Sequence, residues 1–177
     1  MLVDPFLKGR YCSLRLVEFD DVAFILKLRT DSKKSQHLNP TDNNVQKQVD
    51  WLISYKKRED KGTEFYFIII GTDGSSIGTY RVSDITKVNA TAGSWIIVDG
   101  SDYKAVYESV ILMYNFLFDH LMINEIVFNV RKANKKVQKF HELYGSELTH
   151  ENEIELFYVF KKENLLKMQA MFTKFIG

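Results

Sequence analysis

His141 is the residue of this sequence whose chemistry most needs an explanation. It belongs to the helical segment "ANKKVQKFHELYG" (133–145), in which Val137, Phe140, His141 and Tyr144 fall on one face. An imidazole with an ordinary pKa near ~6.5 can donate a proton when charged, donate a hydrogen bond when neutral, or accept a proton through a water. An inward-facing histidine therefore acts either as an acid–base group or as a core residue bonded to a backbone carbonyl. The spacing alone leaves both interpretations open.

A second stretch has features of a phosphate site. "DGSDYKAVYES" (99–109) brings the turn at Gly100 to the start of a helix. Successive backbone N–H groups at a helix N-terminus, together with the helix dipole, can hold a pyrophosphate. Lys104 adds a positive charge there. Taken alone, this stretch fits an ordinary helix start equally well.

Hydrophobic patterning predicts the framework that positions these residues, a single α+β domain over residues 1–177 with neither an internal repeat nor a linker. Strand patterns occupy residues 13–19, 63–71, 77–85, 91–98, 124–130, 146–150 and 154–162. Helical patterns occupy residues 20–31, 42–59, 103–121, 133–145 and 164–176. The helix between strands 91–98 and 124–130 forms a β-α-β crossover, so these two strands are expected to be parallel neighbours.

Composition excludes several classes of protein. The net charge of +1 and the 27% of charged residues give no global field that would attract nucleic acid or an anionic membrane. Cys12 is the single cysteine, so no intrachain disulfide can form and a reducing compartment fits. No uncharged apolar run is long enough for a signal peptide or for a membrane span of ~18 residues. We expect a cytoplasmic protein that uses no metal.

The order and lengths of these elements, from Ser13 to Lys162, resemble those of the GNAT family of acetyl-CoA-dependent N-acetyltransferases. "GSWIIVD" (93–99) is similar to the fourth strand of the family, and residues 100–109 lie where its pyrophosphate loop lies. The family pattern N-x-x-A-x-x-x-Y-x-x-x-G is matched by Asn134, Val137, His141 and Gly145. Histidine here stands where most of the family has a tyrosine acid.

This resemblance implies a GNAT fold, with a single mixed, mostly antiparallel sheet of about seven strands, helices on both faces and an extra C-terminal helix. The parallel strands 91–98 and 124–130 would be splayed around acetyl-CoA, the expected cosubstrate. Helix 164–176 carries too much apolar surface to leave in water. It would therefore pack either on the domain or on a second copy of the chain in a homodimer.

The resemblance also implies a set of contacts for acetyl-CoA, which comprises Ile96, Ile97, Val98, Tyr103, Lys104, Ala105, Val106, Tyr107, Asn134 and Phe140. A backbone N–H near Ile97 would polarise the thioester carbonyl, and His141 would protonate or hydrogen-bond the leaving thiolate. The family loop commonly reads Q/R-x-x-G-x-G/A, whereas "SDYKAV" (101–106) contains no glycine. The donors to the phosphates are main-chain groups in either case.

A small-molecule amine would enter from the face opposite the cofactor, with His37, Tyr80, Arg81 and Trp95 as candidate contacts. Alternation along "GTYRVSD" (78–84) puts Tyr80 and Arg81 on opposite faces of the strand, and the sequence leaves open which face lines the site. The sequence also leaves the identity of the amine open.

Four classes of acceptor or function remain, in order of preference. "VQKQVDWLISYKKRE" (45–59) and "FHELYG" (140–145) are similar to bacterial GNAT enzymes that acylate amino groups on nucleotide-linked sugars, and the 14% of aromatic residues favours this class. "LRLVEFDDVAFILKLRTD" (14–31) is similar to ribosomal-protein and peptide N-terminal acetyltransferases. The third is a GNAT-like fold that has lost catalysis and acts as a ligand sensor or scaffold. A nucleic-acid module, resting on "KKREDK" and "RKANKK", ranks last.

Overall fold

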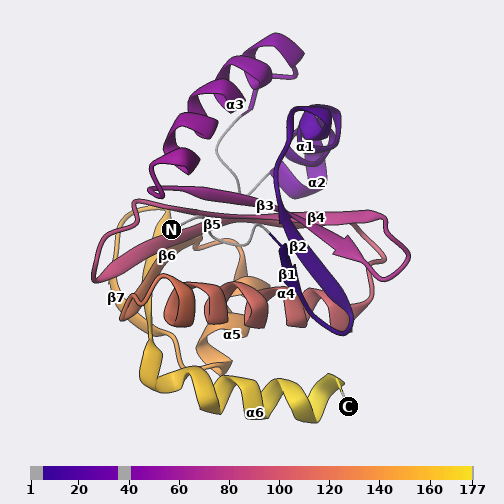
Figure 1. Ribbon diagram of the computed structural model, residues 1–177. Coiled ribbons are helices and arrows are strands. Elements are labelled where there is room, and N and C mark those ends of the chain that lie inside the picture. Colours follow the sequence, from indigo (N-terminus) through magenta and orange to yellow (C-terminus); the bar gives the residue numbers. More distant parts are fainter. Residues whose placement is uncertain (1–5, 36–40, 177) are drawn as a thin grey trace.

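The computed structural model describes residues 6–35 and 41–176. Over these residues the centre of the fold is one eight-stranded sheet in the order β1-β2-β3-β4-β5-β6-β8-β7 (Figure 1). Its strands are β1 (Phe6–Lys8), β2 (Cys12–Leu16), β3 (Phe65–Gly71), β4 (Ser76–Ser83), β5 (Asn89–Ile97), β6 (Glu125–Arg131), β7 (Glu147–Glu151) and β8 (Glu155–Lys161). The expected number of about seven is one too low, because the three-residue β1, which pairs with β2 across a tight turn, is too short to leave a pattern in the sequence.

Helices cover both faces of the sheet, as expected (Figure 1). One face carries α1 (Val22–Thr30), the short α2 (Ser32–Ser35) and α3 (Val45–Asp60), and a 3-10 turn (Phe19–Asp21) leads into α1. The other carries α4 (Tyr103–Asn115), which continues as one π-helical turn (Phe116–His120), then α5 (Lys135–Leu143) and α6 (Leu165–Ile176), which follows a 3-10 turn (Lys162–Asn164). None of the helices in the described ranges is long and apolar enough to cross a membrane.

Each face of the sheet has its own apolar core. On the side of α4, α5 and α6, fully buried side chains such as Phe67, Phe116 and Phe160 pack between sheet and helices. On the side of α1 and α3, a smaller core contains Ile25, Leu52 and Tyr55. The run "FYFIII" in β3 feeds both cores because successive side chains of a strand point to opposite faces, so a strand covered on both faces is continuously apolar.

The sheet contains one parallel pair, and this pair opens at one end. β5 and β6 are paired only from Asn89↔Glu125 to Thr91↔Val127. Beyond Thr91, β5 follows β4 instead, with an irregular register in which Arg81 faces Gly93 and Thr79 faces Ile96. Ser94, at this bulge, has a φ of 48°, a left-handed conformation that is uncommon outside glycine. The two strands therefore diverge, as the family resemblance predicted.

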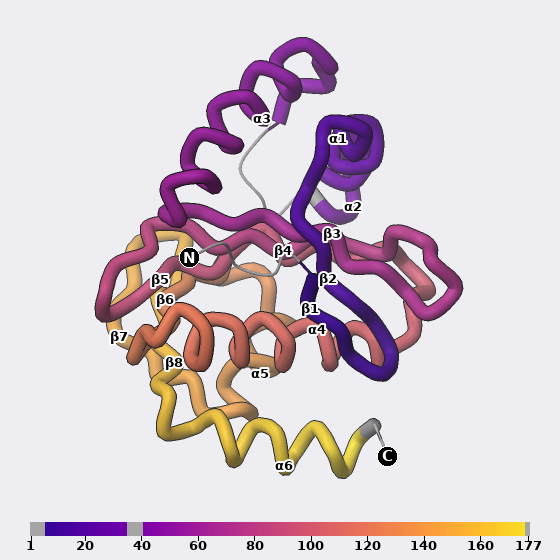
Figure 2. Tube along the Cα trace, in the orientation of Figure 1, coloured from indigo at the N-terminus to yellow at the C-terminus, as the bar shows by residue number. Residues whose placement is uncertain are grey.

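The chain ends on the α4 side of the sheet. β8 lies antiparallel between β6 and β7, which confirms the predicted closing pair with boundaries shifted by about one residue. Figure 2 shows α6 beyond α4 and α5, away from the sheet and from α1 and α3. Leu165, Met168 and Phe172 are buried in this contact. Of the two alternatives that the sequence left open for this helix, the structure shows packing on its own domain, and the homodimer stays a prediction.

Candidate functional site

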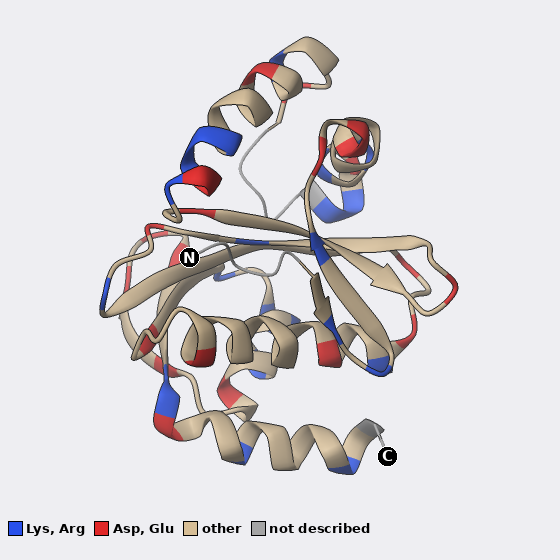
Figure 3. Cartoon of the chain, viewed as in Figure 1, with Lys and Arg blue, Asp and Glu red and all other residues tan. Residues whose placement is uncertain are grey.

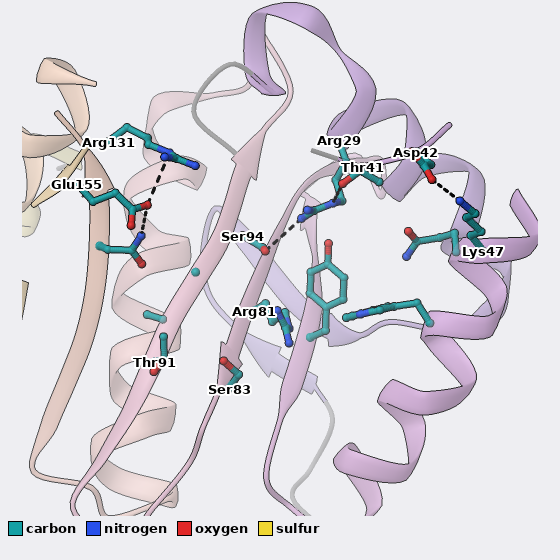
Figure 4. A pocket seen from close by; sticks show the side chains of 16 residues that line it. Arg29, Thr41, Asp42, Lys47, Arg81, Ser83, Thr91, Ser94, Arg131 and Glu155 are labelled. Atoms are coloured by element: carbon teal, nitrogen blue, oxygen red, sulfur yellow. Dashed lines mark hydrogen bonds and ion pairs between the residues drawn. The ribbon is translucent and has the colours of Figure 1, made fainter. Parts of the chain in front are cut away.

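Two cavities lie against the diverging part of β5. The first, of about 300 Å³, lies between β5, β6 and α5 and is called here the inter-strand cavity; its lining includes Tyr80, Trp95, Ile96, Ile97, Asn134 and His141. The second, of about 560 Å³, is lined by α1, α3 and the sheet and is called the arginine cavity (Figure 4). Ala92, Gly93, Ser94, Asn129 and Arg131 line both cavities. The two cavities therefore meet where β5 leaves β6.

His141 lines the inter-strand cavity from α5 and is 8% exposed. Its ring lies 4.2 Å from the ring of Phe128 and 6.4 Å from that of Trp95, measured between centroids. Burial lowers the pKa of the imidazole to about 4, so the ring is neutral at pH 7. Among the described residues, the imidazole makes ring contacts but no hydrogen bond. The alternative of a core histidine bonded to a backbone carbonyl therefore does not describe this side chain.

The backbone of β5 offers hydrogen-bonding groups to the same cavity. The amide of Val98 donates to the carbonyl of Ile77 on β4 at 2.8 Å. Backbone groups of a strand alternate between its two neighbours, so the N–H and C=O of Ile97 point the other way, toward β6. Because β6 is no longer paired with β5 at this point, these groups face the gap. Val98 itself is not among the residues that line the cavity.

The start of α4, where the sequence predicted a phosphate cradle, is capped by its own aspartate. Gly100 makes the expected turn with a φ of 80°, but Asp102 caps the helix, and its carboxylate accepts the amide N–H of Lys104 at 2.9 Å. The side-chain nitrogen of Lys104 lies 5.1 Å from the centre of the Tyr11 ring. None of the five candidate positions in this turn lines the described part of the inter-strand cavity; they are Tyr103, Lys104, Ala105, Val106 and Tyr107.

Packing explains where the aromatic members of this set lie. Tyr107 stacks on Phe140, with ring centroids 5.7 Å apart, and Phe140 in turn lies 5.1 Å from Trp95. Phe140 therefore joins α5 to α4 behind the cavity instead of lining it. Tyr103 is more than half exposed, whereas Ala105 is buried in the core.

Asn134 and two lysines complete the inter-strand cavity. The side chain of Asn134 caps α5 by accepting the amide N–H of Val137 at 3.3 Å, and it also lines the cavity, so the capping and binding roles considered from sequence are compatible. Lys33 and Lys34 of α2 line the cavity as well. The ammonium of Lys34 pairs with Asp99 and lowers the pKa of that exposed carboxyl. Sequence reasoning missed both lysines, although the adjacent "KK" after the first helix was the available signal.

The expected acceptor contacts divide between the two cavities. Arg81 lines the arginine cavity, whereas Tyr80 and Trp95 line the inter-strand cavity on the other side of the sheet. The indole N–H of Trp95 donates to the hydroxyl of Ser109 at 3.2 Å, which directs this ring toward α4. The structure thus places Tyr80 and Arg81 on opposite faces of β4, as the alternation predicted, and which of them contacts the amine stays a prediction. His37 lies outside the described residues.

The arginine cavity combines several charged groups. Cations in its lining are Arg29, Lys47, Arg81 and Arg131, and the acids are Asp42 and Glu155. Glu155 accepts a hydrogen bond from Asn129 at 2.6 Å and lies 3.6 Å from the Nε of Arg131 (Figure 4). On the ribbon as a whole, basic and acidic segments are interspersed in the view of Figure 3, so the concentration of arginines is a local property of this cavity.

Residues 13–147 match the acetyltransferase (GNAT) domain family. Among solved structures, the chain is similar to apo FdhC, described as a nucleotide-linked sugar GNAT, with 33% identity and a TM-score of 0.88 over 99% of this chain and 100% of that one. It is also similar in fold to RimJ of Mycobacterium smegmatis in complex with CoA-disulfide, with 15% identity and a TM-score of 0.73 over 90% of this chain and 88% of that one.

A third similar structure is spermidine N-acetyltransferase from Vibrio cholerae in complex with CoA and spermine, with 17% identity and a TM-score of 0.74 over 89% of this chain and 99% of that one. At these low identities, the second and third structures support the fold alone. No curated protein sequence matches the chain.

Proposed function

The chain belongs to the GNAT acetyltransferase family, and we propose that it transfers an acetyl group from acetyl-CoA to the primary amine of a nucleotide-linked amino sugar. The observation that carries this proposal is the junction of the two cavities at Gly93 and Ser94. A donor held between β5 and β6 and an acceptor held in the arginine cavity can meet there without either crossing the sheet.

The residues of the inter-strand cavity fit the pantetheine arm of CoA. Its amides need hydrogen-bonding partners along an extended path, and the N–H and C=O of Ile97 face the gap without a partner strand. Asn134 adds a side-chain amide, while Lys33 and Lys34 add positive charge for the phosphates. We assign the start of α4 a smaller share of phosphate binding, because the amide N–H of Lys104 already donates to the carboxylate of Asp102.

Acetyl-CoA supplies a thioester whose acyl carbon accepts the amine. Over the whole reaction an N–C bond forms, a C–S bond breaks, and one proton passes from nitrogen to sulfur. The Ile97 amide is suited to polarise the carbonyl, because a fixed donor needs no reorganisation as charge develops. The neutral imidazole of His141 can accept a proton at one ring nitrogen and donate from the other, so it is our candidate to relay this proton.

The amino-sugar acceptor rests on two observations. FdhC, which is described as a nucleotide-linked sugar GNAT, is 33% identical to this chain over almost the full length of both proteins. The arginine cavity, at about 560 Å³, also has room for a ligand much larger than a simple amine.

Binding and turnover test this proposal in two steps. Saturating acetyl-CoA should raise the melting temperature, because a ligand that binds only the folded state stabilises it. Release of the CoA thiol should then be followed with a nucleotide-linked amino sugar, with spermidine and with a peptide bearing a free N-terminus. We expect release with the sugar. An unchanged melting temperature would overturn the proposal, binding without turnover of any amine would favour the non-catalytic alternative, and turnover of the peptide alone would favour N-terminal acetylation.

A further inference from the structure

We propose that Arg29 and Tyr66 form a subsite in the arginine cavity for the phosphate groups of the acceptor. This inference rests on the proposed function, since it assigns one part of the same acceptor. It predicts that the nucleoside diphosphate portion of the acceptor, and not the sugar alone, determines which amines the protein acetylates.

Arg29 is the first of the two observations. Its Nε donates to the hydroxyl of Thr41 at 2.8 Å and its NH1 to the hydroxyl of Ser94 at 3.3 Å (Figure 4). A guanidinium has five N–H donors, so three remain after these two bonds. Within the described residues, no carboxylate pairs with Arg29. The two hydroxyls therefore fix the position of the Arg29 guanidinium without neutralising its positive charge.

In the described structure, the other cations of the cavity each have a carboxylate partner, unlike Arg29. Nε of Arg81 lies 2.7 Å from Oε1 of Glu64, which is buried. Arg131 is within ion-pair distance of Glu155, and Lys47 pairs with Asp42. Among the cations that line the described part of the cavity, Arg29 alone lacks a carboxylate. The positive excess of the lining is thus concentrated at one guanidinium.

Tyr66 is the second and independent observation. It lines the same cavity from β3 and is only 2% exposed, yet its hydroxyl makes no hydrogen bond in the described structure. A buried hydroxyl without a partner is costly and uncommon in native proteins. Thr79 and Arg29 lie near enough to the hydroxyl to oppose the effect of burial, but neither is at hydrogen-bonding length and angle, and burial still raises the pKa of this phenol, so it remains a protonated donor. A ligand oxygen would satisfy it.

Together these groups select a ligand by charge and geometry. A guanidinium fork with free donors and a phenolic O–H suit phosphate oxygens, which accept several charge-assisted hydrogen bonds at once. Arg29 is also anchored at Ser94, where the two cavities meet. In a nucleotide-linked amino sugar, the diphosphate is about one sugar ring from the amine, which matches a phosphate site beside the point of transfer. A polycationic amine such as spermidine would meet an uncompensated positive charge there.

Calorimetric titration of the full chain with uridine diphosphate, thymidine diphosphate and inorganic pyrophosphate, at one fixed salt concentration, tests the subsite. The two nucleotides should bind with similar affinity, because their shared chemistry is the diphosphate. Arg29→Gln should weaken binding by about 10–100-fold, and Arg29→Lys by less, because the charge remains but the fork is lost. Lys167→Gln is the matched control, since it removes one exposed positive charge from α6 on the other side of the sheet and should leave the dissociation constant unchanged.

Tyr66→Phe is the second variant, and it keeps the ring in its perpendicular contacts with Trp51 and Tyr55. We expect about 5–10-fold weaker binding of the diphosphates with little change in melting temperature, because the hydroxyl makes no hydrogen bond in the described structure of the free protein. Wild-type affinity in both Tyr66→Phe and Arg29→Gln would overturn the subsite.

The subsite and the proposed function can fail separately. If diphosphates bind and the variants weaken them, but no amine releases CoA, the subsite stands and the proposed acetyl transfer is wrong. If free and nucleotide-linked amino sugars are acetylated with equal kcat/KM, the transfer stands and the subsite is wrong. If only the nucleotide-linked sugar is acetylated, and Arg29→Gln raises its KM without changing kcat, both are supported.

Discussion

The imidazole of His141 and the ring of Phe128 lie 4.2 Å apart, centroid to centroid, so α5 packs directly on β6 beside the gap between the diverging strands. This contact buries a titratable ring without giving it a hydrogen-bond partner among the described residues. The same side chain should therefore influence both the stability of the fold at low pH and the chemistry at the cavity. These two effects can be measured separately.

The first prediction concerns acid stability. Burial lowers the pKa of His141 to about 4 in the folded chain, below the ~6.5 of an unfolded histidine, so the unfolded state binds more protons between these values. Its contribution to stability is present above pH ~6.5 and is lost as the pH falls toward ~4. The free energy of unfolding in urea should fall by about 2 kcal/mol from this group between pH 7 and pH 5.

Other groups also titrate in this range, so the diagnostic quantity is the difference between wild type and His141→Phe. The phenyl ring keeps the contacts with Phe128 and Trp95 but cannot bind a proton. The variant should lose less stability than wild type on going from pH 7 to pH 5. An identical pH dependence in the two proteins would show that His141 is not the buried neutral group described here.

The second prediction concerns turnover by the same variant. If His141 relays the proton, His141→Phe should lower kcat by about 10²–10⁴-fold while its melting temperature at pH 7 and its affinity for acetyl-CoA stay close to wild type. His141→Tyr should recover part of the rate, because a phenol can donate to sulfur from the same place. Steady-state kinetics and a melting curve on one preparation give both quantities. A stable, fully active His141→Phe would refute the catalytic role.

The helical spacing of residues 133–145 and the alternating strands were enough to predict the sheet, its parallel pair and the inward position of His141, because burial repeats with the period of each element. The same periodicity could not show that Asp102 caps α4, since several polar residues precede that helix and each is a credible cap. The phosphate cradle predicted for Tyr103 to Tyr107 stays a prediction, since it depends on which backbone amides beside this cap bind the phosphates.

Some residues of the site could not be identified from the sequence, because each one fits the ordinary pattern of the helix or strand that contains it. Tyr66 lies inside the apolar run of β3, where nothing distinguishes it from a core residue. The bulge at Gly93 and Ser94 changes the phase of alternation along β5, so the side on which Trp95 points cannot be counted from its neighbours. Arg29 is one of two basic residues on α1, with Lys27, and its role depends on Ser94, 65 positions away.

The third prediction concerns the C-terminal helix. Phe172 is fully buried and its ring stacks on Tyr144 with centroids 4.4 Å apart, so Phe172→Ala should reduce the free energy of unfolding by about 3–5 kcal/mol. Leu166, on the same helix, is 78% exposed, and Leu166→Ala should change it by less than about 0.5 kcal/mol. Urea unfolding measures both. Equal effects of the two substitutions would mean that α6 does not pack as described.

The fourth prediction compares two lysines as partners for the phosphates of CoA. Lys34 lines the inter-strand cavity, whereas the ammonium of Lys104 lies over Tyr11 and outside it. Lys34→Gln should raise the dissociation constant of CoA by about 3–10-fold and reduce its dependence on salt, because one charge-assisted contact is lost. Lys104→Gln should stay within about twofold of wild type. Calorimetric titrations at two salt concentrations give these values for both variants.

A ligand without phosphates tests whether Lys34→Gln weakens CoA binding through the phosphates. S-acetylpantetheine retains the arm that would lie along β5 but lacks the phosphates, so wild type and Lys34→Gln should bind it equally. If Lys34→Gln weakened S-acetylpantetheine as much as CoA, Lys34 would contact the arm or support the cavity wall. If Lys104→Gln proved the more damaging substitution for CoA alone, the start of α4 would be restored as the phosphate site, with Asp102 displaced from the Lys104 amide on binding.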